Sequence, residues 1–224
     1  MLIKNKIGIG TGGFAIEADE WENEKSSIRF ALDIGYTVID TAQIYGNGNC
    51  EILVGESIKG YDRSNIQIIT KVLPFDDPVD SLYNSLKRLQ VDYVDMYMLH
   101  WYENTNMEET ITMFQLLMDR KVIHNYGVSN FDKGLLLKWK QLEREMGVSG
   151  ITANQIHISK NNVVDEELIL YHKNNGIITI ASSPLDKGVL SPDNLMYAKY
   201  YSDLVLVRSK NLKHIEQNYQ VFND

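Results

Sequence analysis

The chain has 224 residues, of which 44% are hydrophobic and 23% are charged, so it can bury one sizeable core and has the composition of a water-soluble globular protein. Its formal net charge of -8 argues against binding to a nucleic-acid backbone, which requires a basic surface. The single cysteine, Cys50, excludes an internal disulfide, and neither a signal peptide nor a membrane-spanning apolar run is evident. These features predict a cytoplasmic protein without a nucleic-acid or membrane partner.

Short runs rich in β-branched residues alternate with longer segments of helical spacing along the chain. Such an alternation predicts parallel βαβ units, and eight strands are the number that closes a (β/α)8 TIM barrel. We therefore expect one α/β barrel domain over residues 1–224. The eight runs begin at Ile7, Thr37, Ile66, Tyr93, Ile123, Ile151, Gly176 and Asp203.

Local signals mark some of the helix boundaries. Asp77 followed by Pro78 is typical of a helix start, and Gly35 lies where a helix would end before the next strand. Residues 183–202 must hold both a functional loop and a helix, so the seventh helix is expected to be short or degenerate. Few residues follow Asn218, so we expect a minimal barrel without a long C-terminal tail.

The first glycines of the chain match the spacing of a glycine-rich motif that binds dinucleotides in another fold. Gly8, Gly10 and Gly13 fit G-x-G-x-x-G, and Asp40 ends the following strand, as in a Rossmann unit. That motif requires a full buried strand before it and a helix directly after it. Only the half-polar MLIKNKI precedes Gly8, and FAIEADEWENE follows Gly13. We interpret the glycines as a strand-end loop that gives a ligand close access to the backbone.

Ionisable residues end three consecutive apolar strands. Asp40 ends the second, Lys71 the third and His100 the fourth, while Tyr45 lies in the loop after Asp40. The carboxyl ends of barrel strands converge on one face, so we expect these four side chains to lie together. Each residue taken singly is as readily a structural polar group, but three consecutive strand ends favour a functional site.

The residue types define the chemistry that such a site can perform. A tyrosine has a pKa near 10, and a neighbouring charged lysine is expected to lower it toward the working range. A carboxylate would hold the lysine in place, and a histidine would orient a carbonyl oxygen. The four residues would then deliver a proton to a carbonyl oxygen, whereas the hydride must come from a cofactor.

At these residues the sequence resembles the aldo-keto reductase family. The resemblance implies a (β/α)8 oxidoreductase that uses NADP(H), without a metal, to reduce aldehydes or ketones to alcohols. Tyr45 would be the proton donor, Lys71 and Asp40 would tune it, and His100 would position the carbonyl. The segments that carry the resemblance are IGIGTGGF, TVIDTAQIYGNGNCEILVG, IITKV, DYVDMYMLHW, GVSNF, ANQIH, ASSPLDKG and VRSKNLKHIEQN.

The resemblance also assigns binding residues. Those near the nicotinamide and its ribose would be Thr11, Gly12, Asp40, Ser129, Asn130, Gln155 and Ser182. Those along the pyrophosphate would be Ser183, Pro184, Leu185 and Asp186. Those around the adenosine 2′-phosphate and the adenine would be Arg208, Ser209, His214 and Asn218, with Lys210 and Lys213 adding positive charge. The substrate would contact Phe14, Tyr45, His100 and Trp101.

Three departures from the family pattern bear on function. Ser182 stands where the family has an aromatic residue that stacks on the nicotinamide, and His214 replaces an arginine in the phosphate-binding helix. Arg208 still favours NADP(H) over NAD(H), although a histidine is only partly charged near neutral pH. The short chain also lacks the family's N-terminal hairpin and much of its seventh helix. We expect exposed apolar surface on strands seven and eight, covered by a partner subunit in a homo-oligomer.

Two other functions remain open at this stage. An NADP(H)-binding redox sensor or regulatory subunit with little turnover is favoured by Ser182 and the trimmed seventh helix. A barrel aldolase could form a Schiff base through Lys71, but this would leave Tyr45 and Asp40 unexplained. The sequence does not identify the substrate.

Overall fold

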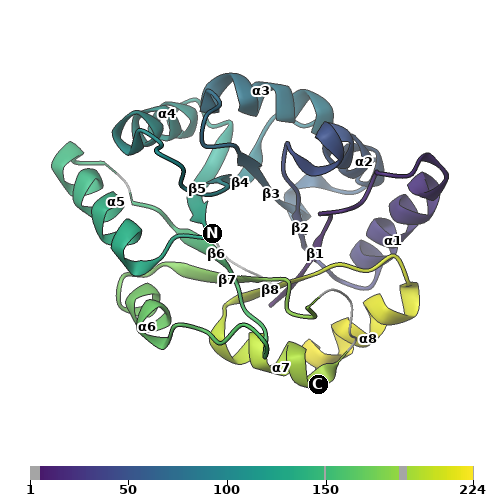
Figure 1. Ribbon diagram of the computed structural model, residues 1–224. Coiled ribbons are helices and arrows are strands. Elements are labelled where there is room, and N and C mark those ends of the chain that lie inside the picture. Colours follow the sequence, from purple (N-terminus) through teal and green to yellow (C-terminus); the bar gives the residue numbers. More distant parts are fainter. Residues whose placement is uncertain (1–5, 149, 187–190, 224) are drawn as a thin grey trace.

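Eight parallel strands close into a barrel in the computed structural model, which describes residues 6–148, 150–186 and 191–223 (Figure 1). Each strand pairs with the next in chain order, and β8 closes the barrel against β1 with Leu206 opposite Gly8. The predicted TIM barrel is thereby confirmed. The strands are β1 (Ile7–Gly10), β2 (Val38–Asp40), β3 (Gln67–Val72), β4 (Val94–Leu99), β5 (Ile123–Ser129), β6 (Ala153–His157), β7 (Ile178–Ser182) and β8 (Leu204–Val207).

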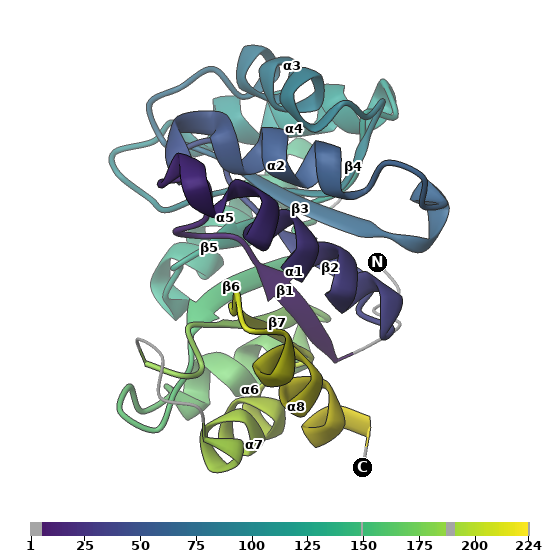
Figure 2. The same cartoon turned by 90° about the vertical axis from the view of Figure 1, so that its right-hand side faces the viewer.

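The helices form an outer layer around these strands, as the two perpendicular views show (Figures 1 and 2). One α-helix follows each strand, which is the arrangement that the alternating sequence pattern predicts. They are α1 (Trp21–Asp33), α2 (Asn49–Ser57), α3 (Pro78–Leu89), α4 (Met107–Asp119), α5 (Lys133–Met146), α6 (Glu166–Asn174), α7 (Pro192–Tyr201) and α8 (Leu212–Asn223). None of the helices in the described part of the chain is long and apolar enough to cross a lipid bilayer.

The predicted boundary signals at α1 and α3 are confirmed. The Asp77 carboxylate accepts hydrogen bonds from the backbone N–H groups of Val79 and Asp80, with Pro78 in the first turn of α3. Gly35 follows the end of α1 and has a φ of 112°, which a residue with a side chain rarely adopts. The chain can therefore turn directly from α1 toward β2.

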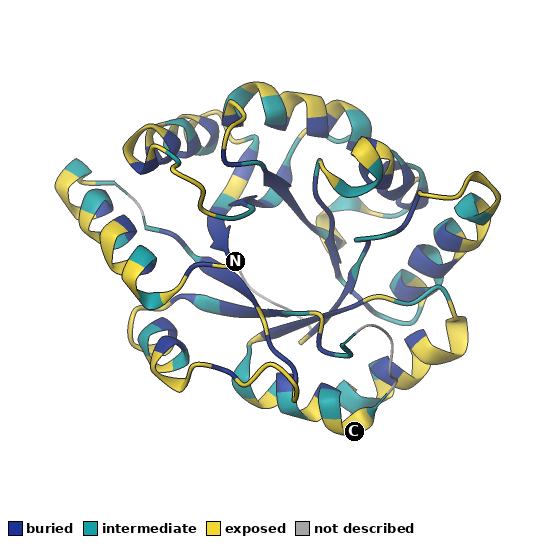
Figure 3. Ribbon diagram, viewed as in Figure 1, coloured by how far each residue is buried: buried dark blue, intermediate teal, exposed yellow. Residues whose placement is uncertain are grey.

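Apolar side chains fill the barrel on both sides of its wall. The larger cluster lies between strands and helices, so the inward faces of the helices are buried while their outer faces are exposed (Figure 3). Because the lumen is also packed, the barrel is no channel, and a ligand site must lie at one of its ends. The lumen is filled by Val38, Ile69, Met96, Met98, Ala153, Ile180, Leu204 and Leu206.

The seventh helix covers more of the barrel than we expected. It is short, with ten residues, but α2 and α6 have nine each. Its Leu195 and Ala198 side chains are buried, and every residue of β8 is buried as well. The expectation of exposed apolar surface on β7 and β8 is therefore wrong. Ten helical residues suffice to cover this side, so a partner subunit is not needed to shield it.

The contact between α2 and α3 gives a test of the packing. A side chain at Gly55 in α2 would overlap the backbone carbonyl of Leu89 at the end of α3. We predict that Gly55→Ala lowers the free energy of unfolding by about 1–3 kcal/mol, as overpacking does, despite the better helix propensity of alanine. The control is Gly134→Ala in α5, where a Cβ has room. Urea unfolding of both variants would contradict the account if Gly55→Ala were as stable as Gly134→Ala.

Candidate active site

Tyr45 reaches the carboxyl end of the barrel through a tight turn after β2. The turn is a short 3-10 helix (Tyr45–Gly48), in which Gly46 and Asn47 have positive φ values of 55° and 53°. A Cβ at Gly12, in the loop after β1, would lie 3.4 Å from the Cζ of Tyr45. The absence of a side chain at Gly12 therefore lets the Tyr45 ring lie directly against the backbone of the first loop.

Lys71 and Asp40 form a buried ion pair beside this ring. The Nζ of Lys71 lies 2.7 Å from Oδ1 of Asp40 and donates a 2.8 Å hydrogen bond to the carbonyl oxygen of Thr41. Lys71 is 0% exposed and Asp40 is 5% exposed. The amide of Gln155, on β6, donates a 2.9 Å hydrogen bond to the same Oδ1. Burial lowers the pKa of Lys71, but Asp40 and Tyr45 outweigh it and raise the pKa overall, so the lysine stays charged.

The Tyr45 phenol keeps its proton more firmly than the sequence predicted. The Nζ of Lys71 lies 5.1 Å from the centre of the Tyr45 ring, and its charge is the largest single influence, lowering the pKa of the phenol. Burial and the negative charge of Asp40 act in the opposite direction and prevail, so the pKa of Tyr45 is raised above its ordinary value. The expected fall of this pKa toward the working range is therefore wrong. At neutral pH Tyr45 carries its proton and can only donate it.

His100 faces Tyr45 from the end of β4. The two ring centres are 5.6 Å apart and the rings meet edge to face, at 77°. Burial and the charge of Lys71 lower the pKa of His100 to about 3, so the imidazole is neutral at pH 7. Its Nδ1 is buried and has no hydrogen-bond partner among the described residues. A neutral ring beside a protonated phenol provides two polar groups that can bind one carbonyl oxygen.

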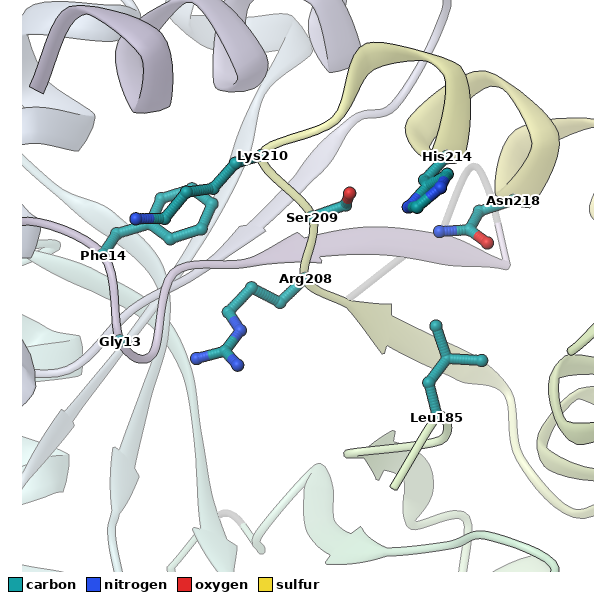
Figure 4. A pocket seen from close by; sticks show the side chains of 8 residues that line it. All are labelled: Gly13, Phe14, Leu185, Arg208, Ser209, Lys210, His214 and Asn218. Atoms are coloured by element: carbon teal, nitrogen blue, oxygen red, sulfur yellow. The ribbon is translucent and has the colours of Figure 1, made fainter. Parts of the chain in front are cut away.

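Two cavities lie next to each other at this end of the barrel. One of about 260 Å³ is lined by the side chains of the ion-pair region and by the loop after β7, and one of about 290 Å³ lies beside the start of α8 (Figure 4). They share Leu185 and Arg208. The first is lined by Gly10, Gly12, Asp40, Tyr45, Gln155, Ser182, Ser183, Pro184, Leu185, Asp186, Leu206, Val207 and Arg208. The second is lined by Gly13, Phe14, Leu185, Arg208, Ser209, Lys210, His214 and Asn218.

The second cavity carries polar groups that suit a nucleotide. Asn218 is 1% exposed, yet neither its Nδ2 nor its Oδ1 has a hydrogen-bond partner among the described residues. An unpaired buried amide is costly, so a ligand offering one donor and one acceptor, such as the edge of a base, fits it. Arg208 and Ser209 supply donors for phosphate oxygens in the same cavity. The residues present therefore fit a dinucleotide that spans both cavities.

Other residues assigned to the nicotinamide line neither cavity. Thr11 is fully buried, and its hydroxyl donates a 3.1 Å hydrogen bond to the carbonyl oxygen of Asp40. Ser129 is buried beside Gln155 on the neighbouring strand. Asn130 is exposed, and its amide donates to Oγ of Ser129 at 3.0 Å and to the carbonyl oxygen of His100 at 3.2 Å. Thr11 contacts the backbone of Asp40, and Ser129 lies opposite the Gln155 that holds the side chain of Asp40. Contact of these residues with a cofactor stays a prediction.

The aromatic residues assigned to the substrate are separated in the structure. Phe14 is 0% exposed and lines the second cavity, whereas Tyr45 lines the first. Trp101 packs on His100, with ring centres 5.0 Å apart, and its Nε1 donates a 2.9 Å hydrogen bond to Glu103. Trp101 is therefore placed beside the proposed reaction site, whereas Phe14 is not.

The loop after β7 is held by its acidic residue. Oδ1 of Asp186 lies 3.1 Å from Nε2 of His157, and Oδ2 accepts a 2.8 Å hydrogen bond from Asn161. Hydrogen bonds, first of all from Ser159, lower the pKa of Asp186. These contacts hold the loop after β7, which lines the first cavity, against the segment that follows β6. Residues 187–190, which complete the predicted functional loop, lie outside the described residues.

Some contributors to the site were not found from the sequence. Leu206 and Val207 are apolar residues that line the first cavity, and their position at the end of β8 was the only available signal. Glu24 on α1 lies 2.6 Å from Nζ of Lys210, a lysine that we had expected to serve the phosphate. Gly13, which we interpreted as part of a strand-end loop that gives a ligand access to the backbone, lines the second cavity. No spacing rule connects Glu24 with Lys210, because the contact forms only when α1 packs beside α8.

The sequence is similar to those of known proteins. A sequence model of the Aldo/keto reductase family matches residues 6–203. The chain is 30% identical to methylglyoxal reductase YeaE of Escherichia coli (strain K12), over 80% of this chain and 63% of that protein. It is 33% identical to aldo-keto reductase YhdN of Bacillus subtilis (strain 168), over 84% of this chain and 60% of that protein. The chain thus spans about three fifths of the length of both curated relatives.

Solved structures resemble the whole barrel. An aldo/keto reductase from Klebsiella pneumoniae, in complex with NADP and acetate, superposes with a TM-score of 0.84 and 26% identity, covering 98% of this chain and 86% of that one. An aldo/keto reductase from Brucella melitensis superposes with a TM-score of 0.81 and 30% identity, covering 98% of this chain and 88% of that one.

The neutral state of His100 predicts a pH dependence of stability. The folded pKa of about 3 lies below the ordinary 6.5, so the unfolded chain takes up a proton between these values and the folded protein does not. Stability is therefore lost as the pH falls below about 6.5. We predict that from about pH 7 to about pH 5 the wild type loses about 1–2 kcal/mol more than His100→Gln. Urea unfolding at both pH values measures this, and equal losses would refute a buried neutral imidazole.

Proposed function

The chain belongs to the aldo/keto reductase family, and from this premise we propose that it reduces carbonyl groups of small aldehydes or ketones with NADP(H). One observation carries the proposal. The Tyr45 phenol is kept protonated between a charged Lys71 and a neutral His100, and it lines a cavity that shares Leu185 and Arg208 with a second one. The NADP in the Klebsiella pneumoniae structure supports the choice of cofactor.

In the proposed reaction the cofactor supplies the hydride and the chain supplies the proton. The bound nicotinamide supplies a hydride to the carbonyl carbon. The Tyr45 hydroxyl donates its proton to the carbonyl oxygen, which leaves a phenolate. Lys71, which Asp40 keeps charged, stabilises this phenolate. Its positive charge therefore stabilises Tyr45 more strongly after the proton transfer than before it. His100 binds the same oxygen and orients it toward the phenol.

Several residues would hold the cofactor in this scheme. Gln155 faces the first cavity while its amide holds Asp40, and Ser182 with the loop after β7 forms one wall. Asn218 offers its unpaired amide to the base. As a first substrate we propose a small α-oxoaldehyde, because relatives from several bacteria are named methylglyoxal reductases.

Ser182 supports a second candidate function. It lines the first cavity without the ring that the resemblance led us to expect there, and loss of a stacking partner weakens ring binding by about 1 kcal/mol. A barrel that holds NADP(H) but turns over little would then act as a redox sensor. Tight NADPH binding without oxidation by a broad set of aldehydes and ketones would favour this function over the reductase.

The reductase makes a direct prediction for Tyr45. We expect the wild type to oxidise NADPH in the presence of methylglyoxal, and Tyr45→Phe to slow this by about 100-fold or more, because no proton donor remains. The matched control is Tyr200→Phe on α7, where the side chain is 81% exposed and the rate should be unchanged. NADPH absorbance measures the rate, and fluorescence titration checks that the cofactor still binds. An active Tyr45→Phe protein would refute the mechanism.

A further inference from the structure

His172 is a buried histidine of α6, far along the chain from the four residues that form the proposed reaction site. It is 0% exposed, and both of its ring nitrogens have polar partners. Nδ1 lies 2.9 Å from the hydroxyl oxygen of Thr179 on β7, and Nε2 lies 3.1 Å from Nδ2 of Asn154 on β6. Burial lowers the pKa of His172 to about 4, against the opposing effect of the Asp203 carboxylate, so the ring is neutral at pH 7. A neutral imidazole has one donor and one acceptor nitrogen, so its partners decide which nitrogen carries the proton.

The side-chain amide of Asn154 fixes the direction of these hydrogen bonds. Its Oδ1 accepts a 3.4 Å hydrogen bond from the backbone N–H of Phe131, and its Nδ2 donates a 2.9 Å hydrogen bond to the carbonyl oxygen of the same residue. The reverse orientation of the amide would place N–H against N–H and oxygen against oxygen. The second N–H of Nδ2 is therefore directed at His172, whose Nε2 must accept it. The ring proton is then on Nδ1, which donates to the hydroxyl oxygen of Thr179.

Phe131 belongs to the loop after β5, and this loop reaches the proposed reaction site. Asn130, the residue before it, has a φ of 60°, a value that a residue other than glycine keeps only where the surrounding contacts fix it. Its backbone N–H donates a 2.8 Å hydrogen bond to the carbonyl oxygen of Gln155. Its side-chain amide donates a 3.2 Å hydrogen bond to the carbonyl oxygen of His100. The position of this loop therefore bears on the position of His100.

We propose that His172 is a positioning residue for the active site: as the tautomer protonated on Nδ1, it accepts a hydrogen bond from Asn154 and so orients the amide that holds the loop after β5. Its effect on the reaction rests on the proposed function, whereas the tautomer does not. Without an acceptor at position 172, Nδ2 of Asn154 keeps a buried, unpaired N–H, which is costly unless the amide moves. Such a movement displaces Phe131, and with it Asn130 and the backbone of His100.

NMR of the full chain with ¹⁵N-labelled histidine rings tests the tautomer without any substrate. We expect Nδ1 of His172 to be protonated and Nε2 to be unprotonated at pH 7, with the signals assigned through His172→Phe. The backbone amide signals of Asn130 and Phe131 should shift in that variant. A His172 ring that is protonated on Nε2, or on both nitrogens, contradicts the hydrogen-bond directions and overturns the inference.

Three variants separate positioning from stability in the oxidation of NADPH by methylglyoxal. His172→Phe removes the acceptor but keeps a ring, and we expect it to lower kcat by about 10-fold while KM changes by less than about twofold, because a small displacement of an orienting group slows the reaction. His172→Gln keeps one acceptor and one donor, so its kcat should lie closer to that of the wild type. The matched control is Leu168→Ala, one turn earlier on α6, which removes a buried apolar side chain. It should lower the melting temperature but leave kcat unchanged.

All rates are measured well below the melting temperature of each variant. The inference is overturned if His172→Phe and Leu168→Ala lower kcat alike, or if His172→Phe leaves kcat and the Phe131 amide signal as in the wild type. A wild type without turnover refutes the proposed function and with it the effect on kcat. The tautomer and the shift of the Phe131 signal are then still decided by NMR.

Discussion

The buried ion pair between Lys71 and Asp40 is the interaction on which the site depends. Removing two charges from water is costly, and the cost is offset only when the geometry is good and the remaining hydrogen-bonding groups are satisfied. Here the carbonyl of Thr41 and the amide of Gln155 complete the arrangement. Lys71, Asp40 and Thr41 come from the neighbouring strands β3 and β2 and the loop after β2. Gln155 comes from β6, so the full set of partners is present only when β6 has also joined the barrel.

The positive charge of Lys71 acts on the pKa values of two neighbouring groups, His100 and Tyr45. It lowers the pKa of His100, in the same direction as burial, so the imidazole is neutral. It also favours the phenolate of Tyr45, but burial and the charge of Asp40 prevail. The result is a protonated Tyr45 phenol next to a neutral His100 imidazole that can form hydrogen bonds. This arrangement suits proton transfer from Tyr45 to a carbonyl oxygen on which negative charge develops. The phenolate that the transfer leaves on Tyr45 is stabilised by the positive charge of Lys71.

The convergence of Asp40, Lys71 and His100 could be predicted because strand order and strand ends are local properties of the sequence. The direction of the Tyr45 pKa could not, because it depends on how deeply tertiary packing buries the ring. Likewise, the sequence shows Lys210 near a phosphate site but not Glu24, which packing of α1 brings to it. The cover over β8 was misjudged for a related reason: the length of α7 says little about how well Leu195 and Ala198 pack.

The central claim is that the Tyr45 phenol holds its proton through neutral pH while Lys71 opposes this. It is tested most directly by NMR titration of the protein with ¹³C-labelled tyrosine rings, with the Tyr45 signal assigned through Tyr45→Phe. The account predicts that the pKa of Tyr45 lies above the ordinary value of a tyrosine and that it rises further in Lys71→Met. A Tyr45 signal that titrates near neutral pH, or that does not move in Lys71→Met, would contradict the account.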